Sequence, residues 1–500
     1  MSETAPAAAG RRFLTADIRR LLPIVGAGAA AGLSSLVTTI LVARLLTSRG
    51  YGAFIVLLGL FLVLSMPGSA LLVAVVRRIT AWESEGHYDR IHPWALRVHR
   101  FGTAAVVVLA VAIFLLRGPL ISALKLPGSG GLVEIITAAG IWVLVSIDRG
   151  ILQARQDYRH LSLNLVLEAV SRTVFTIGLA AAAGVTGAAH GVLLGEVVTA
   201  VHARVRSMAA LRRPTPVAAA LTQDTVLTPE AVLAPEAVLA EEAVLAPESV
   251  LAPEAVLAPE AALTAAAAVP ALSGPMPSSH TTRHLAADMA TALVCLALLA
   301  VLQNADVIGL GSQAPHRSGS YAAISVPSKA LVFAALIFIN YLLPESAIRW
   351  RQGSHALRQL GHTLAILAMP AGLLLVLAVA VPRTLLDVVF GAKLAGAAPA
   401  FATLVLAMVC LCVTVVVTVY LLGVGWRFVV VLLGAGTAAL IVLTLRAHGQ
   451  FVATARADLV VQAALALATA AALVGVHRHA GHWLPAERAD VPAKGASAAP

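Results

Sequence analysis

The chain has 500 residues, of which 59% are hydrophobic and only 12% are charged, and its mean hydropathy is +0.89. A typical soluble domain carries about 25% charged residues, so this composition excludes a soluble globular protein and predicts an all-α integral membrane protein. The formal net charge of +10 does not predict nucleic-acid binding, because no basic cluster falls on a stretch that could fold as a soluble domain.

Membrane spans are predicted from long apolar stretches, and one span needs about 20 such residues. Residues 1–20 precede the first stretch as a polar, basic tail that lacks the pattern of a cleavable signal. Twelve stretches qualify as spans: 22–43, 51–76, 101–117, 131–152, 163–184, 186–209, 284–311, 321–345, 359–381, 396–423, 427–446 and 457–477. Because 101–117 is short and 427–446 is followed closely by the last stretch, a count of ten remains open.

Three arginines mark the ends of the first two predicted spans. Arg44 ends the first span, where it is either an anchor at the outer interface or part of a polar cavity. Arg77 and Arg78 end the second span on the cytoplasmic side, where arginines commonly fix the topology. At that surface they can also bind the phosphate of a lipid headgroup.

Two charged residues fall inside the fifth predicted span. Glu168 precedes Arg172 by four residues, the favourable order for an ion pair on a helix. An arginine at the centre of a bilayer costs about 3 kcal/mol even on lenient insertion scales, so the pair should face other helices or a water-filled cavity. One interpretation is a self-neutralised pair that joins helices. The other is a cationic lining for an anionic cargo, because the guanidinium fork can bind two phosphate oxygens.

A low-complexity segment separates the first six spans from the last six. From Thr228 it reads TPEAVL APEAVL AEEAVL APESVL APEAVL APEAAL, six hexapeptides with seven glutamates. Proline at nearly every sixth position forbids a continuous helix, and a hexapeptide β-helix would have too few repeats to bury a core. We predict a disordered cytoplasmic spacer, with an acidic docking strip as the alternative.

The predicted spans divide the chain into five parts. These are a basic tail over 1–20, an N-terminal six-helix lobe over 21–211, the linker over 212–283, a C-terminal six-helix lobe over 284–480 and a cytoplasmic tail over 481–500. The lobes carry related motifs, because Tyr51 and Tyr321 each open a span that leads to a proline and then an arginine. Six spans in each lobe make these parallel repeats, an organisation of transporters that bind cargo between their lobes.

The seventh predicted span holds the strongest polar signal of the C-terminal half. Gln303, Asn304 and Asp306 fall within four residues of one another, and such groups must face the protein interior in a membrane. They are predicted either to bond neighbouring helices or to form a site, with Asn304 and Asp306 as the site candidates. A third interpretation is that the span ends earlier and Asp306 lies near the membrane interface.

Lysine and arginine, counted loop by loop, are concentrated on the side that holds the N-terminus, with the segment from Arg149 to Arg159 counted as a cytoplasmic loop. This bias predicts that both termini are cytoplasmic. The sequence has no phosphate-binding loop, no His-Glu-x-x-His and no Gly-x-Ser-x-Gly motif, so we expect neither ATP hydrolysis nor another enzymatic activity. Cys295, Cys410 and Cys412 lack metal-ligand spacing, and we expect no bound metal and no cofactor.

Two segments carry a family resemblance. They read LVARLLTSRGYGAFIVLLGLFLVLSMPGSALLVAVVRR and LQNADVIGLGSQAPHRSGSYAAISVPSKALVFAALIFINYLLPESAIR. They resemble the first two spans and the seventh and eighth spans of polysaccharide-transport (Wzx-like) flippases of the MOP (multidrug/oligosaccharidyl-lipid/polysaccharide) exporter superfamily. The likeness lies in an Arg-Leu-Leu ending, a Tyr-Gly opening, an Asn-x-Asp pair and a later Gly-x-Tyr and proline.

The resemblance implies a V of two six-helix lobes around a cationic cavity, which translocates polyprenyl-diphosphate-linked oligosaccharides. The family's functional acid would fall on Asp306, and its cavity arginines on Arg44 and Arg172. The long acidic linker departs from the family pattern.

Together these features predict a multi-pass flippase of the cytoplasmic membrane that moves a polyprenyl-diphosphate-linked glycan for cell-wall and surface-polysaccharide assembly without ATP. Arg44 and Arg172 would attract the diphosphate, and a proton or sodium ion would reset the cycle through Asp306 or Glu168. Membrane lipids are expected partners, with a polysaccharide polymerase or glycosyltransferases as further candidates. Two alternatives remain open: a cation-coupled drug or metabolite antiporter of the same fold, with an acid-lined cavity, and a non-transporting scaffold that recruits cell-wall enzymes through the linker.

Overall fold

The structure is a computed structural model that describes residues 31–32, 34–126, 130–212, 279–332, 335, 357–423 and 426–480. The regular elements within these ranges are all helices, and helix occurs in each of the twelve predicted spans. Eight of the described helices are long and apolar enough to cross a membrane, or nine if one bent pair counts as a single span. The prediction of an all-α multi-pass membrane fold is confirmed, whereas the acidic repeat lies outside the described residues.

The N-terminal half consists of a short helix (Ser34–Leu45), α2 (Ser48–Ser84), α3 (Tyr88–Leu124), α4 (Leu132–Ala154) and α5 (Tyr158–Arg212). α4 packs against α2, α3 and α5 and is the central helix of this half. α5 contains two arms, because Ala183 and Gly184 leave the helical conformation between them. Gly184 has a φ of 62°, a value that favours glycine, and it allows the reversal that separates the fifth and sixth predicted spans.

The C-terminal half consists of α8 (Ser279–Gln313), helical residues 318–332, α10 (Leu357–Ala380), α11 (Pro382–Val389), the 3₁₀ helix η2 (Ala392–Ala400), α12 (Phe401–Gly423), α13 (Val429–Arg446) and α14 (Phe451–Ala480). α12 packs against α10 and α14, and α13 packs against α8 and α14. The chain bends by 102° between α10 and α11. Pro382 begins the new helix there. Proline suits the first position of a helix, because a backbone N–H at that position would have no acceptor within the helix.

Hydropathy alone underestimates the length of α3. The apolar stretch 101–117 is the shortest predicted span, but α3 has 37 residues. Its first turns are amphipathic, and Ile91 and Ala95 pack there against Val75 and Ile79 of α2. The helix is therefore long enough to span, which removes one of the two reasons for a count of ten.

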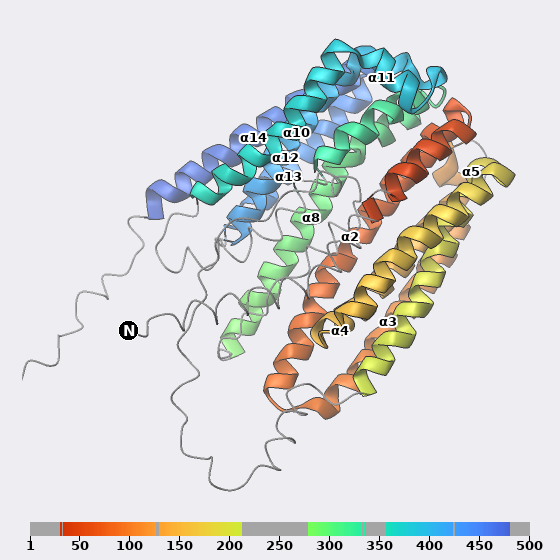
Figure 1. Cartoon of the computed structure of the whole chain (residues 1–500). Coiled ribbons are helices and arrows are strands. Elements are labelled where there is room, and N and C mark those ends of the chain that lie inside the picture. Colours follow the sequence, from red (N-terminus) through yellow and green to blue (C-terminus); the bar gives the residue numbers. More distant parts are fainter. Residues whose placement is uncertain are drawn as a thin grey trace, which may run out of the picture.

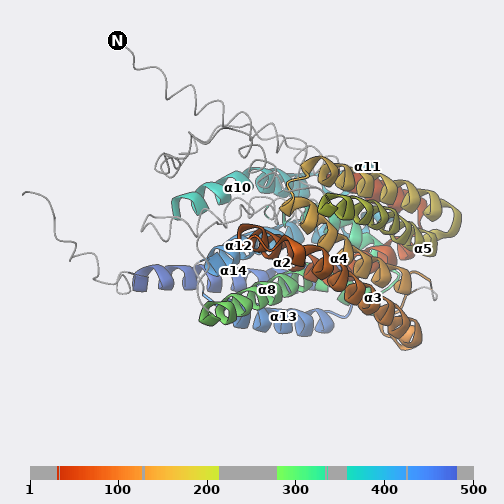
Figure 2. The ribbon, with the colours of Figure 1, turned by 90° about the horizontal axis from the view of Figure 1, so that it is seen from below.

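The two halves lie side by side and meet mainly where α2 packs against α8. Figure 1 shows the halves along their length, and Figure 2 shows them from below, with α3, α4 and α5 on one side and α10, α12 and α14 on the other. At one end the backbones approach very closely. A Cβ added to Gly52 would lie 1.9 Å from Ser318 Oγ, and one added to Gly319 would lie 1.9 Å from the carbonyl oxygen of Ser48. The two copies of the repeated motif thus meet in this contact, which we call the seam.

Candidate transport site

A row of glycines brings the two arms of α5 together. Gly187, Gly191 and Gly195 lie four residues apart on the second arm and face the first arm. A Cβ added to Gly195 would lie 2.7 Å from Arg172 Cα, so a larger residue cannot take its place without a shift. Small residues at this spacing permit close helix packing in membranes. The row therefore holds polar side chains of both arms near one another inside the N-terminal half.

Arg149 is the most deeply buried cation of this region, with 1% of its side chain exposed. Its Nε donates to Asn164 Oδ1 at 2.7 Å, and its Nη2 pairs with Glu168 Oε2. Asn164 Nδ2 donates in turn to the Thr199 carbonyl oxygen at 3.0 Å. The assignment of Arg149 to a cytoplasmic loop was wrong, because α4 continues to Ala154 and carries this residue into the interior.

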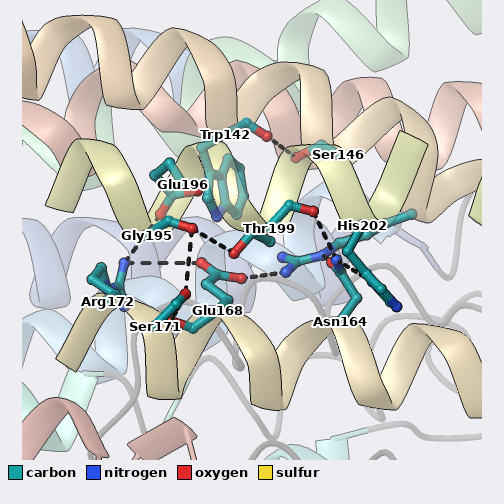
Figure 3. Close-up of polar contacts among 11 residues, drawn as sticks. Trp142, Ser146, Asn164, Glu168, Ser171, Arg172, Gly195, Glu196, Thr199 and His202 are labelled. Atoms are coloured by element: carbon teal, nitrogen blue, oxygen red, sulfur yellow. Dashed lines mark hydrogen bonds and ion pairs between the residues drawn. The ribbon is translucent and has the colours of Figure 1, made fainter. Parts of the chain in front are cut away.

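Arg172 lies between two glutamates in the same cluster (Figure 3). Its Nη1 is 3.9 Å from Glu168 Oε1 and 3.6 Å from Glu196 Oε1. The predicted pair of Glu168 and Arg172 is thus present, but it belongs to a group of two arginines and two glutamates. The side chain of Arg172 is 17% exposed, whereas those of both glutamates are buried. Binding of cargo by Arg172 stays a prediction.

Asp148, an acid of α4, joins three helices. Asp148 Oδ1 accepts from Ser207 Oγ at 2.7 Å and from Arg204 Nη1 at 3.3 Å, both on α5. Its Oδ2 is 3.8 Å from Nδ1 of His99 on α3. These contacts bond helices to one another, because the partners of Asp148 lie on two other helices, α3 and α5.

The C-terminal half holds a buried cluster around Asp306. Lys329 Nζ donates to Asp306 Oδ1 at 3.2 Å and to Asn304 Oδ1 at 3.5 Å. Asp458 of α14 is also fully buried and interacts electrostatically with both Asp306 and Lys329. Gln462 Nε2 donates to Asp458 Oδ1 at 3.2 Å. Two buried carboxylates and one buried ammonium group thus belong to this cluster.

Sequence reasoning missed Lys329 and Asp458, although the signal that identified Asp306 also applies to them. Each is a charged residue inside a predicted apolar span, 321–345 or 457–477. Their grouping with Asp306 was not visible, because it depends on the packing of three separate helices.

Arg44 lies at the seam. It is exposed, and its Nη2 donates to the Val388 carbonyl oxygen at 2.7 Å, near the end of α11. Lys393 makes the reciprocal contact, since its Nζ donates to the carbonyl oxygens of Arg44 at 3.0 Å and Leu46 at 2.6 Å. The last carbonyls of a helix have no intrahelical donor, and cations there are favourable. In the described contacts Arg44 therefore joins the two halves rather than meeting Arg172.

Arg77 and Arg78 lie exposed on α2, close to the turn into α3. The guanidinium of Arg78 lies 4.4 Å from the centre of the Trp82 ring, and Trp82 packs edge-on against Trp94 of α3. Tryptophans of this kind are typical of a membrane–water interface. Binding of a lipid phosphate stays a prediction.

Within the described ranges no group of three His, Cys, Asp or Glu residues could hold a metal ion. Cys295 and Cys412 are buried, as expected for small packing residues.

No family model matches the sequence, and no curated protein matches it. Solved structures are similar. One is an inward-facing multidrug resistance MATE family transporter of the MOP superfamily, at 13% identity with a TM-score of 0.61, covering 90% of this chain and 96% of that chain. Another is the MATE multidrug transporter DinF-BH, at 14% identity and a TM-score of 0.53, covering 91% and 94%. A third is a MATE protein in the bent conformation, at 16% identity and a TM-score of 0.51, covering 93% and 96%.

At these identities the likeness shows the fold alone. The chain has the two-lobe, all-helical fold of MOP-superfamily transporters, as the sequence resemblance implied. The Wzx-like branch stays a prediction.

Proposed function

We propose that the chain is a cation-coupled, ATP-independent flippase that moves a polyprenyl-diphosphate-linked oligosaccharide across the cytoplasmic membrane. The observation that carries the coupling step is the buried cluster of Asp306, Lys329 and Asp458. Charges are expensive in a membrane and are kept mainly where they serve a pathway or a relay. The excess carboxylate would take up a proton or sodium ion, and Asn304 Oδ1, which accepts from Lys329, supplies a further oxygen in the cluster.

The cargo step rests on the N-terminal cluster. Of its two arginines, Arg172 is the accessible one, with 17% of its side chain exposed against 1% for Arg149. A diphosphate would compete with Glu168 and Glu196 for the Arg172 fork, which can bind two phosphate oxygens at once. Arg149 would keep Glu168 compensated while Arg172 turns to the cargo.

Alternating access would then require the seam to open and close. The seam holds the two halves together through Arg44 and Lys393, and in the predicted orientation it lies on the outer side. The fold neighbours are transporters rather than enzymes, which supports the expectation that the chain catalyses no covalent chemistry.

A second function has its own support. Five acids lie buried in the described helices, against two buried cations. The acids are Asp148, Glu168, Glu196, Asp306 and Asp458, and the cations are Arg149 and Lys329. An excess of acids suits a cationic cargo, so a cation-coupled antiporter of small molecules is the alternative. One fold neighbour, DinF-BH, is a multidrug transporter.

The test is the lipid-linked saccharide profile of a deletion strain, with the inner-leaflet fraction resolved. We expect a completed lipid-linked glycan to accumulate on the cytoplasmic side, and Arg172→Ala and Asp306→Asn to fail to restore export. Arg117→Gln, at an exposed arginine of α3, is the matched control and should restore it. Full export by both interior variants would refute the proposal, and an unchanged profile with new drug sensitivity would favour the antiporter.

A further inference from the structure

One end of the N-terminal half carries a dense group of exposed arginines, which we call the basic face. It comprises Arg77 and Arg78 of α2, Arg90, Arg97 and Arg100 of α3, and Arg159, Arg206 and Arg212 of α5. The exposed acids near the α2–α3 turn are Glu85 and Asp89, so the face is strongly positive.

Shared packing places these arginines at one end of the molecule. Trp82 of α2 and Trp94 of α3 pack on the same small apolar core as Met208 and Leu211 of α5. Figure 1 shows the α2–α3 turn and the last turns of α5 at the same end of the molecule. The end of α5 and the α2–α3 hairpin therefore pack on one shared core, to which α4 also contributes.

This hairpin is too long to lie wholly within a bilayer. α2 and α3 have 37 residues each, which corresponds to about 55 Å of helix at 1.5 Å per residue. The hydrocarbon layer is about 30 Å thick, so the turns near Arg90 extend into water. Lipid phosphates can reach the arginines at the base of the hairpin, but a tethered chain can reach those at its tip as well.

Such a chain starts at this face. α5 ends at Arg212 and α8 begins at Ser279, so residues 213–278 leave from the basic face. This segment holds Asp224 and seven glutamates, and its one basic residue is Arg213. Fifteen residues separate Arg212 from the first repeat at Thr228, and an extended chain of that length reaches about 45 Å. Neighbouring helices are only about 10 Å apart, so the whole face is within range.

We propose that the acidic repeat, residues 228–263, docks on the basic face of its own chain. Each exposed ion pair contributes at most about 1 kcal/mol, but many weak pairs act together, and a short tether gives millimolar effective concentration. The contact does not depend on the cargo or the coupling ion, so it stands apart from the proposed function. It assigns a role to a segment that the transport cycle leaves unused.

The test maps where the repeat lies. A photo-crosslinking amino acid replaces Val244 in the full chain, which is held in nanodiscs of neutral phosphatidylcholine, and cross-linked peptides are identified by mass spectrometry. We expect cross-links to concentrate on residues 77–100 and 206–212. Their yield should fall about tenfold in about 1 M salt, where the Debye length is about 3 Å.

Matched variants separate charge from proximity. Replacing the seven glutamates by glutamine should remove the cross-links, and so should the combined change of Arg77, Arg90 and Arg97 to glutamine. A repeat with scrambled order that keeps all seven glutamates should keep the cross-links. The change of Arg117 and Arg383 to glutamine should keep them too, because these arginines are exposed elsewhere on the molecule. Cross-links scattered over other surfaces, or yields indifferent to salt and to the glutamates, would overturn the proposal. Loss of the cross-links in nanodiscs that contain phosphatidylglycerol would also overturn it, because the face would then belong to anionic lipid.

Discussion

The row of glycines on α5 makes a sharp prediction about how Arg172 is placed. In Gly195→Ala the new Cβ would lie 2.7 Å from Arg172 Cα and 2.9 Å from both Arg172 N and Cβ. These are mostly backbone atoms, so a rotamer change cannot relieve the contact. The two arms of α5 must move apart, and the 3.6 Å contact between Arg172 and Glu196 must lengthen with them.

The magnitude follows from a matched control on the same helix. Gly178 has nothing within 4 Å of an added Cβ, so Gly178→Ala should be neutral or stabilising by up to about 1 kcal/mol through helix propensity. Gly195→Ala gains the same propensity but suffers overpacking of about 1–3 kcal/mol. The difference between the two variants in free energy of unfolding should therefore be about 1–3 kcal/mol, since the propensity contribution cancels.

The assay is unfolding of the purified protein in mixed micelles, together with glycan export in the deletion strain. Gly195→Ala should unfold more easily and export less than Gly178→Ala. Equal stability of the two variants would refute the close-packing argument. Lower stability with unchanged export would refute the link between this packing and the function of Arg172.

Two further predictions concern charge. Arg149→Gln should lower the free energy of unfolding by about 3–5 kcal/mol, because it leaves Glu168 buried without its closest partner. Adding Glu168→Gln should recover part of the loss. A double variant no more stable than the single one would contradict the pairing. Lys393→Gln and Arg44→Gln should each widen the seam, measured as spin-label distances between the two halves. Arg383→Gln is the control and should leave these distances unchanged. Equal distances in all three variants would show that the two cations do not hold the seam.

Much of the fold follows from local properties of the sequence. Long apolar stretches predict twelve spans, and helix occurs in each of them within the described residues, because the cost of burying polar groups in a bilayer depends on each stretch by itself. The same logic identified Glu168, Arg172 and Asp306 as interior residues. It would also have identified Lys329 and Asp458, had every charged residue within a span been weighed equally.

The partners of these residues were decided by tertiary structure. The spacing of Glu168 and Arg172 predicted a pair within one helix, but Arg149 arrives from α4 to become the closest partner of Glu168. Arg44 was predicted as an anchor at the outer interface or as a cavity residue, and its side chain donates to the end of α11, far along the chain. Hydropathy and helical spacing report what each segment does alone. Which charges meet depends on which helices pack together, and this is set by features such as Gly195 whose effect exists only when a second helix lies against it.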